Sequence, residues 1–492
     1  MRPAWFPCCL SLLALSAPPA TLAVGTGIRE PAGESRLVHI GQRVGGWGRM
    51  ETLFLHDNHV VARFQGLQRV MGDVRKHPGN PILVADRPWE AGSVGYACVI
   101  YDGEDKLYKM WYESRLNPGQ LRGPNLEQGR CLYATSSDGL VWEKPILGIV
   151  ETNGSRENNI VFAGPDGARN KVYWVVKDRA EPDPARRYKM MFHLWDFRGR
   201  GVGIAFSADG LHWKTDARVN LHGGFDTHNI FFWDDRVGQY VGYFRTRMLG
   251  RRFIARATSP DAFHWSNPVS VHGPDEADPH DFDLYTPGVF KYSRAADTYV
   301  LYTAAFDRDT DRLFGQLAVS RDGIDWQRFR VPFLPLGSDG KWDAGSIYPV
   351  PSQVSVGEET AIYYRGDHVG HGTGGRPGIG VAFLDRGGFV AWEAGTRGTL
   401  TTHALAVGGS RETLYVNGDA SGGSIRAELL DTDGEVIPGF SRQESLPISG
   451  RGPRLLVRWK GKPDLVDAVL RPFRLKLYLE RARVYGIGCT RH

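Results

Sequence analysis

The sequence predicts an all-β protein, namely a five-bladed β-propeller followed by a C-terminal β-sandwich. One observation behind this is the strand-like alternation of apolar and polar residues along most of the 492-residue chain. The other is a motif, Ser-x-Asp-Gly-x-x-Trp, which occurs as SSDGLVW, SADGLHW, SPDAFHW and SRDGIDW. Its aspartates stand at positions 138, 209, 261 and 322, so they are 71, 52 and 61 residues apart. This spacing is typical of propeller blades with four strands each.

Residues 1–24 have the features of a signal peptide. Arg2 gives a positive end, FPCCLSLLALSA is an apolar stretch, and ATLA and LAVG are small-residue cleavage sites near Ala23 or Gly25. The apolar stretch is too short to span a bilayer, and no later stretch is long enough. We therefore expect a secreted or periplasmic protein that does not bind a membrane, with a buried N-terminal helix as the alternative.

Composition narrows the classes of partner. The net charge of +5 is small for this length and no block of Lys and Arg stands out, so we expect no nucleic-acid partner. Beyond the signal peptide the cysteines are Cys98, Cys131 and Cys489, too few for a disulfide framework. Cys98 and Cys131 fall in apolar strand patterns, so we expect buried free thiols, with one bridge between these two as the alternative.

The elements follow in order along the chain. Residues 25–85 contain strand-like alternation at TLFLHD and HVVARF, and we expect them to pack on the propeller or close its ring. Residues 86–395 repeat one order of four strands five times, beginning at VGYACVIYD, KVYWVVKD, THNIFFWDD, LYTPGVFKY and GSIYPVPSQ. After residue 395 the aromatic motif stops, and alternating runs such as TLYVNGD and RLLVRW predict a sandwich over 396–487.

The recurrent motif is expected to be structural. Its Asp caps the backbone of a turn, its Gly supplies a positive φ, and its Trp packs between neighbouring blades. Ala262 replaces the glycine in the third copy, so that turn should be strained or differently shaped. These aspartates are therefore poor candidates for catalysis.

Residues just before the first strand of each blade should gather at one mouth of the central channel, because that strand lines the channel. Four of the five blades present a carboxylate there, whereas the second presents Lys171. The residues are Trp89 and Glu90 in the first blade, Asp226 and His228 in the third, Asp281 and Asp283 in the fourth, and Asp343 in the fifth. Repulsion among such carboxylates pushes their pKa values apart, which suits acid–base catalysis.

Glycosidic cleavage needs one carboxyl that protonates the leaving oxygen and one carboxylate that activates water or attacks carbon. We expect Asp226 to be the proton donor, Glu90 or Asp343 the base, and Asp283 an orienting group. The expected substrate-binding residues are the cationic candidates His228, Arg245 and Arg365 and the aromatic candidates Trp89, Trp111 and Tyr285.

Several segments resemble a known group of proteins. KHPGNPIL followed by RPWE resembles the opening segment of five-bladed propeller glycoside hydrolases, the invertase-like, arabinanase-like and mannoside-phosphorylase-like enzymes. YKMWYES, YATSSDGLVWEKP and GSRENNIVF resemble secreted bacterial proteins with a glycosyl hydrolase family 32-like N-terminal domain. The resemblance implies three acids from the first three blades. Glu90 matches the first and Asp226 approximates the third, but Lys171 stands at the second.

The sequence therefore predicts a secreted glycoside hydrolase that cleaves an oligo- or polysaccharide by carboxylate acid–base catalysis at the central funnel. The alternatives are a non-catalytic carbohydrate-binding propeller, a polysaccharide lyase and a phosphorylase on the same scaffold. We expect a monomer whose partner is a glycan and which needs no cofactor. DPHDFD (278–283) lacks the spacing of a calcium loop, although a structural calcium ion remains compatible with the sequence.

Overall fold

Strands make up nearly all of the secondary structure. The computed structural model describes residues 37–40, 52–115, 129–165, 169–196, 198–222, 225–295, 297–372, 374–407, 412–462 and 471–491. Within these ranges there is no α-helix, only short 3-10 turns such as η1 (Pro88–Glu90) and η3 (Pro184–Arg186), and hence no helix able to cross a membrane. The expected signal peptide lies outside the described residues.

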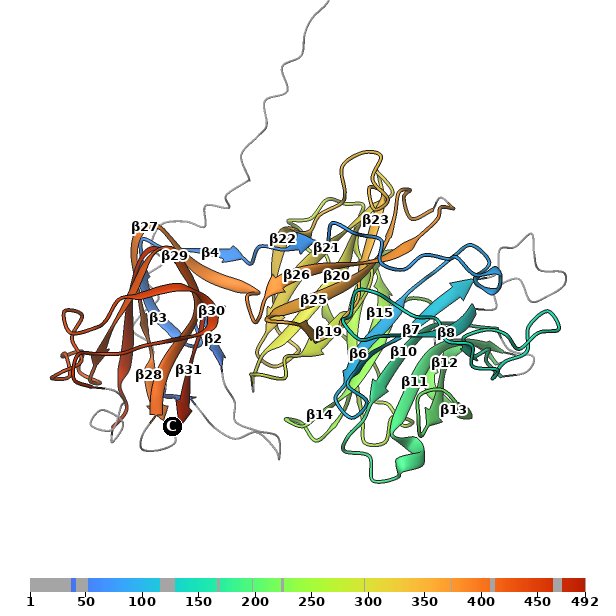
Figure 1. Ribbon diagram of the computed structural model, residues 1–492, viewed down its shortest axis with the longest axis horizontal. Coiled ribbons are helices and arrows are strands. Elements are labelled where there is room, and N and C mark those ends of the chain that lie inside the picture. The colour runs from blue at the N-terminus through green and yellow to red at the C-terminus, as the bar shows by residue number, and fades with distance from the viewer. Residues whose placement is uncertain are drawn as a thin grey trace, which may run out of the picture. The chain divides into compact units, whose positions relative to one another are not determined.

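The middle of the chain folds into five consecutive antiparallel meanders (Figure 1). The first is β6 (Ala97–Asp102), β7 (Leu107–Arg115), β8 (Gly129–Ser136) and β9 (Ile160–Phe162). The second is β10 (Arg169–Lys177), β11 (Tyr188–Asp196), β12 (Gly199–Ser207) and β13 (Lys214–His222). The third is β14 (Ile230–Asp234), β15 (Gln239–Met248), β16 (Arg251–Ser259) and β17 (Val269–His272).

The last two meanders have an interrupted first strand. The fourth is β18 (Phe282–Leu284) and β19 (Gly288–Lys291), both paired with β20 (Tyr299–Asp307), then β21 (Arg312–Ser320) and β22 (Trp326–Leu334). The fifth is β23 (Ser346–Pro349) and β24 (Val354–Val356), both paired with β25 (Glu359–Asp367), then β26 (Gly378–Asp385). Its outer strand is β5 (Arg75–Lys76), which comes from the N-terminal side of the first meander.

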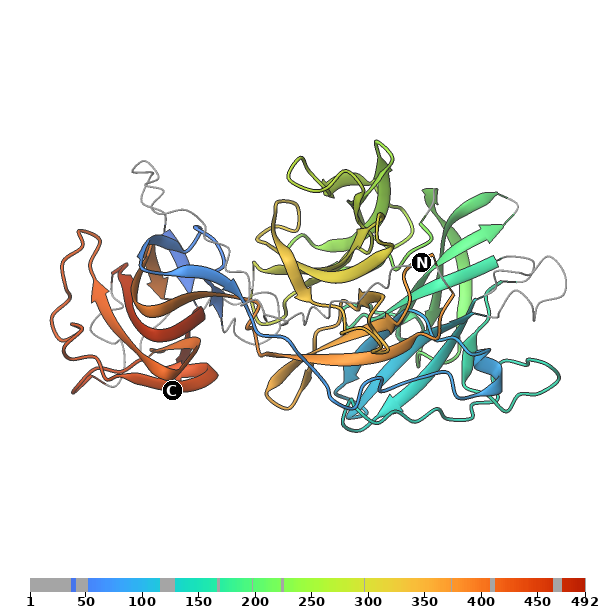
Figure 2. The same cartoon turned by 90° about the horizontal axis from the view of Figure 1, so that it is seen from above.

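Successive meanders contact one another, and the fifth returns to the first. β6 contacts β10, β10 contacts β14, β14 contacts β19, β20 and β21 contact β23, and β24 and β25 contact β6. In both views the blue start of this region lies beside its orange end (Figures 1 and 2). The meanders therefore form a closed series in which each one is covered by its neighbours.

In four of the meanders, a tyrosine at the start of the second strand forms a hydrogen bond with the preceding meander. In three of these contacts the tyrosine hydroxyl donates to a buried aspartate that lies at the end of the first strand of that preceding meander. The pairs are Tyr188 with Asp102 at 2.7 Å, Tyr240 with Asp178, and Tyr299 with Asp234 at 2.5 Å. The first meander makes the equivalent contact with the fifth, because the Tyr108 hydroxyl donates to the Ser355 carbonyl at 2.9 Å.

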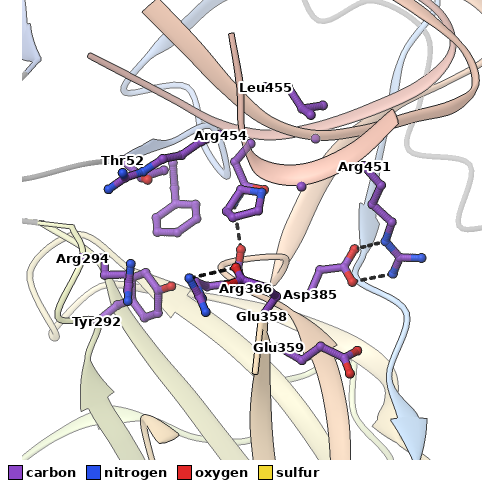
Figure 3. Close-up of a pocket in the computed structure, with 15 residues that line it drawn as sticks. Thr52, Tyr292, Arg294, Glu358, Glu359, Asp385, Arg386, Arg451, Arg454 and Leu455 are labelled. Carbon is purple, nitrogen blue, oxygen red and sulfur yellow. Dashed lines mark hydrogen bonds and ion pairs between the residues drawn. The ribbon is translucent and has the colours of Figure 1, made fainter. Parts of the chain in front are cut away.

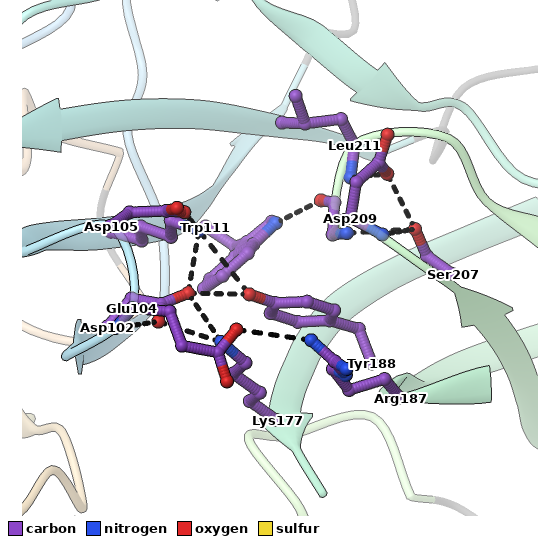
Figure 4. Close-up of polar contacts among 12 residues, drawn as sticks. Asp102, Glu104, Asp105, Trp111, Lys177, Arg187, Tyr188, Ser207, Asp209 and Leu211 are labelled. Carbon is purple, nitrogen blue, oxygen red and sulfur yellow. Dashed lines mark hydrogen bonds and ion pairs between the residues drawn. The ribbon is translucent and has the colours of Figure 1, made fainter. Parts of the chain in front are cut away.

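The recurrent motif forms the turns that the sequence predicts. Asp138 Oδ1 accepts from the backbone N–H groups of Leu140 and Val141 at 2.8 and 2.9 Å, and Gly139 has a φ of 77°. Three of the turns also accept a hydrogen bond from an aromatic side chain of the preceding meander. The contacts are Trp111 to the Gly210 carbonyl, Tyr243 to that of Gly323, and Tyr363 to that of Gly139, at 2.7–2.8 Å (Figure 4).

The third turn keeps the same backbone without glycine. Ala262 has a φ of 68°, so the strain expected from this substitution is present and the shape of the turn is retained. Its carbonyl accepts from Trp265 of its own motif at 2.8 Å, rather than from the second meander.

Four C-terminal strands belong to a separate sheet with its own apolar core. They are β27 (Val390–Thr402), β29 (Glu412–Leu430), β30 (Ile448–Leu456) and β31 (Arg474–Arg491), whereas β28 (Ala404–Val407) lies in a two-stranded sheet. The sheet order is β3 (Val61–Gln65)-β27-β31-β29-β30, and residues such as Trp392, Leu414 and Leu477 are buried in the core. β27 crosses the expected boundary at residue 395. A sandwich remains a prediction.

The N-terminal segment is divided between the two regions. β2 (Leu53–Phe54) pairs with β31, while β3 (Val61–Gln65) and β4 (Gln68–Met71) pair with β27. β1 (Leu37–Ile40) pairs in parallel with β28. Of these N-terminal strands, β5 pairs with the meanders, where the sequence predicts a strand that closes the ring. The N-terminal segment therefore connects the C-terminal sheet to the fifth meander.

Cys98 and Cys131 are buried and form no disulfide bond, which confirms the expected buried thiols and excludes the alternative bridge between them. Burial raises the pKa of the Cys98 thiol, so this thiol is unreactive. Cys489 is also buried.

Gly210→Ala tests the contact between the first two meanders. A Cβ there would lie 2.7 Å from Trp111 Cζ2 at a φ of +79°, so strain and overpacking add to about 2–4 kcal/mol of lost stability. Gly238→Ala is the matched control, because its φ is +65° but nothing lies within 4 Å, and it should lose about 1–2 kcal/mol. Denaturation midpoints measure both, and equal losses would contradict the packing argument.

Asp102→Asn tests the buried carboxylate between the same meanders. Burial raises the pKa of Asp102, but hydrogen bonds from Lys109, Lys177 and Tyr188 outweigh it and hold the pKa well below its usual range. The substitution should cost about 3 kcal/mol at pH 7, because two buried ammonium groups lose their shared counter-charge.

The pH dependence of that loss has a definite sign. The folded pKa of Asp102 is lowered, so its contribution is complete above about pH 4–5 and declines as pH falls below the unfolded pKa of about 3.9. The difference in unfolding free energy between wild type and Asp102→Asn should therefore shrink under acid conditions. A constant difference from pH 7 to pH 3 would contradict the assignment, and exposed Asp309→Asn serves as control.

Candidate functional site

A cavity of about 190 Å³ lies where the first strands of the meanders meet. Its described lining consists of Ser93, Gly95, Tyr96, Lys171, Asp226, Tyr285, Tyr348, Arg365 and His371. All five meanders contribute: Tyr96 precedes β6, Lys171 lies in β10, Asp226 precedes β14, Tyr285 follows β18 and Tyr348 lies in β23. Of the residues that the sequence places just before the first strands, Lys171 and Asp226 belong to this lining.

Asp226 is the carboxylate on the described part of the cavity wall. Its side chain is 30% exposed and forms an ion pair with Arg245, which is buried on β15. The Arg245 guanidinium also lies 5.2 Å from the centre of the Tyr285 ring. Because Arg245 is buried and packs against Tyr285, its ion pair fixes the orientation of the Asp226 carboxylate toward the cavity.

Aromatic rings and imidazoles form most of the remaining wall. Tyr96 stacks on His228 at 5.0 Å and meets Tyr348 edge-on at 5.6 Å. The hydroxyl of Tyr348 and Nδ1 of His371 are 2.6 Å apart, and His371 contacts the Tyr285 ring at 4.7 Å. The Tyr348–His371 pair therefore places two groups that exchange protons on the wall of the cavity.

The imidazoles are neutral at physiological pH. Burial is the main cause that lowers the pKa of His371 to about 4; the charges of Arg252, Arg365 and Arg245 act in the same direction, and that of Asp311 opposes them. Burial also lowers the pKa of His228 to about 4. His228 is 1% exposed beneath Tyr96, so it supports the wall from behind.

Glu90 and Asp343, expected as the base, do not belong to the described lining of the cavity. Glu90 is fully buried after η1, where it accepts from the Tyr112 hydroxyl at 2.7 Å and pairs with Lys144 at 2.7 Å. Asp343 pairs with Lys76 at 2.6 Å and accepts from the Tyr364 hydroxyl at 3.0 Å. In both cases the carboxylate is buried and already accepts hydrogen bonds from neighbouring side chains, which gives it a structural role.

Asp283, expected as an orienting group, is also fully buried. It forms an ion pair with Arg252 and accepts from the backbone N–H of that residue at 2.8 Å. Arg252 in turn lies 4.9 Å from the centre of the Tyr285 ring. Asp283 thus acts on the cavity only through Arg252 and Tyr285.

The tryptophans expected to bind sugar lie elsewhere. Trp89 donates to Asn159 Oδ1 at 2.7 Å, and Trp111 is buried between the first two meanders. Two of the residues expected to bind substrate line the cavity: the aromatic residue Tyr285 and the cationic residue Arg365.

Three residues of the wall are not predicted from the sequence, namely Tyr96, Tyr348 and His371. Tyr96 directly precedes β6 and Tyr348 lies within β23, so extending the set of first-strand positions to aromatic residues would have found these two. Glu113 on β7 is buried behind Gly95, since a Cβ at Gly95 would lie 3.0 Å from Glu113 Oε2. The absence of a side chain at Gly95 therefore leaves the space in which the Glu113 carboxylate lies next to the cavity wall.

A larger cavity of about 730 Å³ lies between the fifth meander and the C-terminal sheet (Figure 3). Several charges on its wall neutralise one another across short distances. Arg451 pairs with Asp385 through two hydrogen bonds of 2.5 Å, and Arg386 pairs with Glu358 at 3.1 Å. We interpret this cavity as a salt-bridged junction and the smaller one as the candidate site.

No group of three or more metal-ligating side chains is found in the described part of the chain. Asp226 and Asp283 are instead paired with arginines. That the protein needs no cofactor, that it is compatible with a structural calcium ion and that it is a monomer remain predictions.

Comparisons with known proteins leave the family open. No family model matches the sequence. The uncharacterized proteins Rv1502 and MT1551 from two strains of Mycobacterium tuberculosis are each 30% identical over 174 residues, which cover 35% of this chain and 49% of theirs. The chain thus spans about half the length of the curated relatives it matches.

Similar solved structures are distant. A structure from the GH130 family, described as containing hydrolases that target β-1,2 mannosidic linkages in Candida mannan, is 15% identical, with a TM-score of 0.42 and coverage of 63% of this chain and 94% of its own. A β-1,2-mannobiose phosphorylase from Listeria innocua is 11% identical, with a TM-score of 0.45 and coverage of 64% and 97%. A thermostable family-43 glycoside hydrolase is 15% identical, with a TM-score of 0.43 and coverage of 61% and 92%.

The His371 imidazole offers a test of the electrostatics of the cavity. Its pKa should be near 4 in the wild type, and Arg365→Gln should raise it, because one of the cations that disfavour the imidazolium is removed. NMR titration of labelled histidine measures the shift. Arg397→Gln removes the same charge from a side chain that is 81% exposed on β27, and it should leave the pKa unchanged. An equal response in both variants would contradict the geometry.

Proposed function

We propose that this chain is a five-bladed propeller enzyme that cleaves a glycosidic bond of an oligo- or polysaccharide in the 190 Å³ cavity. The five meanders would be the blades, since successive meanders contact one another and the fifth returns to the first. The observation that carries the proposal is Asp226, an accessible carboxylate held by buried Arg245 among three tyrosines. Such a wall combines an acid–base group with apolar ring faces for a sugar.

Arg245 favours the ionised form of Asp226, so we assign Asp226 the role of base rather than the proton donor expected from the sequence. In hydrolysis it would accept a proton from the attacking water as the oxygen bonds to the anomeric carbon. The leaving oxygen would receive a proton from the Tyr348 hydroxyl, which is bonded to His371. Proton transfer from Asp226 through solvent would then restore Tyr348.

The proposal is tested with purified protein on a broad glycan panel. Asp226→Asn should lower turnover about 10²–10⁴-fold, because general base catalysis typically contributes this much. It should retain glycan binding. Asp309→Asn, an exposed carboxylate outside the described lining of the cavity, is the matched control and should keep full turnover.

The products distinguish the alternatives. New reducing ends without a phosphate requirement support hydrolysis, a phosphate requirement indicates phosphorolysis, and unsaturated products that absorb in the ultraviolet indicate a lyase. If wild type and Asp226→Asn bind glycan equally well and neither turns it over, the protein is a carbohydrate-binding propeller and the proposed cleavage is wrong.

A further inference from the structure

We infer that the cavity binds a sugar residue carrying an anionic group, a carboxylate or a sulfate ester, and that Arg365 holds this group. The inference deepens the proposed function and takes from it only that the ligand is a saccharide. It concerns recognition, so it does not depend on which residue moves protons.

Both cations and carboxylates surround the cavity. The described lining contains the cations Lys171 and Arg365 and the carboxylate Asp226, which is paired with Arg245 behind the wall. Two buried carboxylates add negative charge, Glu113 behind Gly95 and Asp367 beside Arg365. An anionic ligand therefore depends on a cation whose hydrogen-bond donors face the cavity, where low-dielectric surroundings strengthen the interaction.

Arg365 is the cation of the described lining that is best placed to bind an anion. Its guanidinium approaches Asp367 only to 3.6 Å, longer than the 2.7–2.9 Å of a charge-assisted hydrogen bond. Among the described residues no hydrogen-bond acceptor is found for its donors, although the side chain is only 22% exposed. By contrast, Arg451 on the larger cavity is fully engaged by Asp385 through two hydrogen bonds.

The orientation of Arg365 suits a planar or tetrahedral oxyanion. Its guanidinium lies 4.8 Å from the centre of the Tyr348 ring, which holds the side chain in place and leaves the edge with its N–H donors for a ligand. Arginine binds carboxylates and related oxyanions through two parallel N–H donors. An anion bound here would lie beside the Tyr348–His371 pair.

The size of the cavity limits the ligand. About 190 Å³ is below the roughly 300–1,000 Å³ of sites for drug-sized molecules, so the cavity takes one sugar residue rather than a length of chain. The charged group and the sugar ring must therefore belong to the same residue, which is a uronic acid or a sulfated sugar.

The test compares matched pairs of glycans by calorimetry with Asp226→Asn, so that turnover does not obscure binding. One arm uses uronate-containing polysaccharide fragments and their carboxyl-reduced forms, and the other uses sulfated fragments and their desulfated forms. We expect at least one charged form to bind 10-fold or more tightly than its neutral counterpart. Its affinity should fall between 50 and 500 mM salt.

Variants of Arg365 locate the anion. Arg365→Gln should remove the preference for the charged form, Arg365→Lys should keep part of it, and exposed Arg397→Gln should keep all of it. If thermal unfolding shows that Arg365→Gln is not folded, the affinity of Arg365→Lys and the salt dependence of binding still test the inference. Equal affinity for charged and neutral forms, a preference unchanged in Arg365→Gln, or binding of no member of the panel would overturn the inference.

The two proposals fail separately. Binding of a charged glycan through Arg365 without any turnover would remove the proposed cleavage and leave this inference intact. Cleavage of a neutral glycan that is unaffected by Arg365→Gln would remove this inference and leave the proposed cleavage intact.

Discussion

The hydrogen bond from a tyrosine hydroxyl to the preceding meander is the contact on which the rest of the structure depends. A four-stranded meander cannot cover both of its own faces, so it is stable only between neighbours. The tyrosine contact fixes the register of each neighbour, and in three interfaces its acceptor is a buried aspartate such as Asp102. The Tyr108–Ser355 hydrogen bond is the equivalent contact between the first meander and the fifth.

Buried carboxylates at these interfaces are stabilised by lysines as well as tyrosines. Lys109 and Lys177, from the first and second meanders, both bind Asp102. Figure 4 shows Lys177 and Tyr188 beside this carboxylate. Such an anion is costly to desolvate and becomes favourable only when all its partners are in place, so it specifies which meander lies beside which. The candidate site depends on this order, because its wall combines residues from all five meanders.

The same physics separates structural acids from the candidate functional one. Glu90, Asp283 and Asp343 are buried and paired with cations, which leaves them no accessible oxygen for substrate. Asp226 also has a cationic partner, yet it keeps an exposed edge on a cavity lined by tyrosines. Exposure of the carboxylate, rather than its position before a first strand, therefore distinguishes the two roles.

The sequence by itself determined the all-β class, the turns of the recurrent motif and the buried thiols of Cys98 and Cys131. These features are local, because alternation, a capping Asp and a glycine with positive φ depend only on neighbouring residues. Only the tertiary structure decided that Tyr348, His371 and Arg365 share a wall with Asp226, and that β2, β3 and β4 join the C-terminal sheet. Those outcomes depend on which side chains find buried partners across meanders, and that pairing is settled by packing between segments hundreds of residues apart.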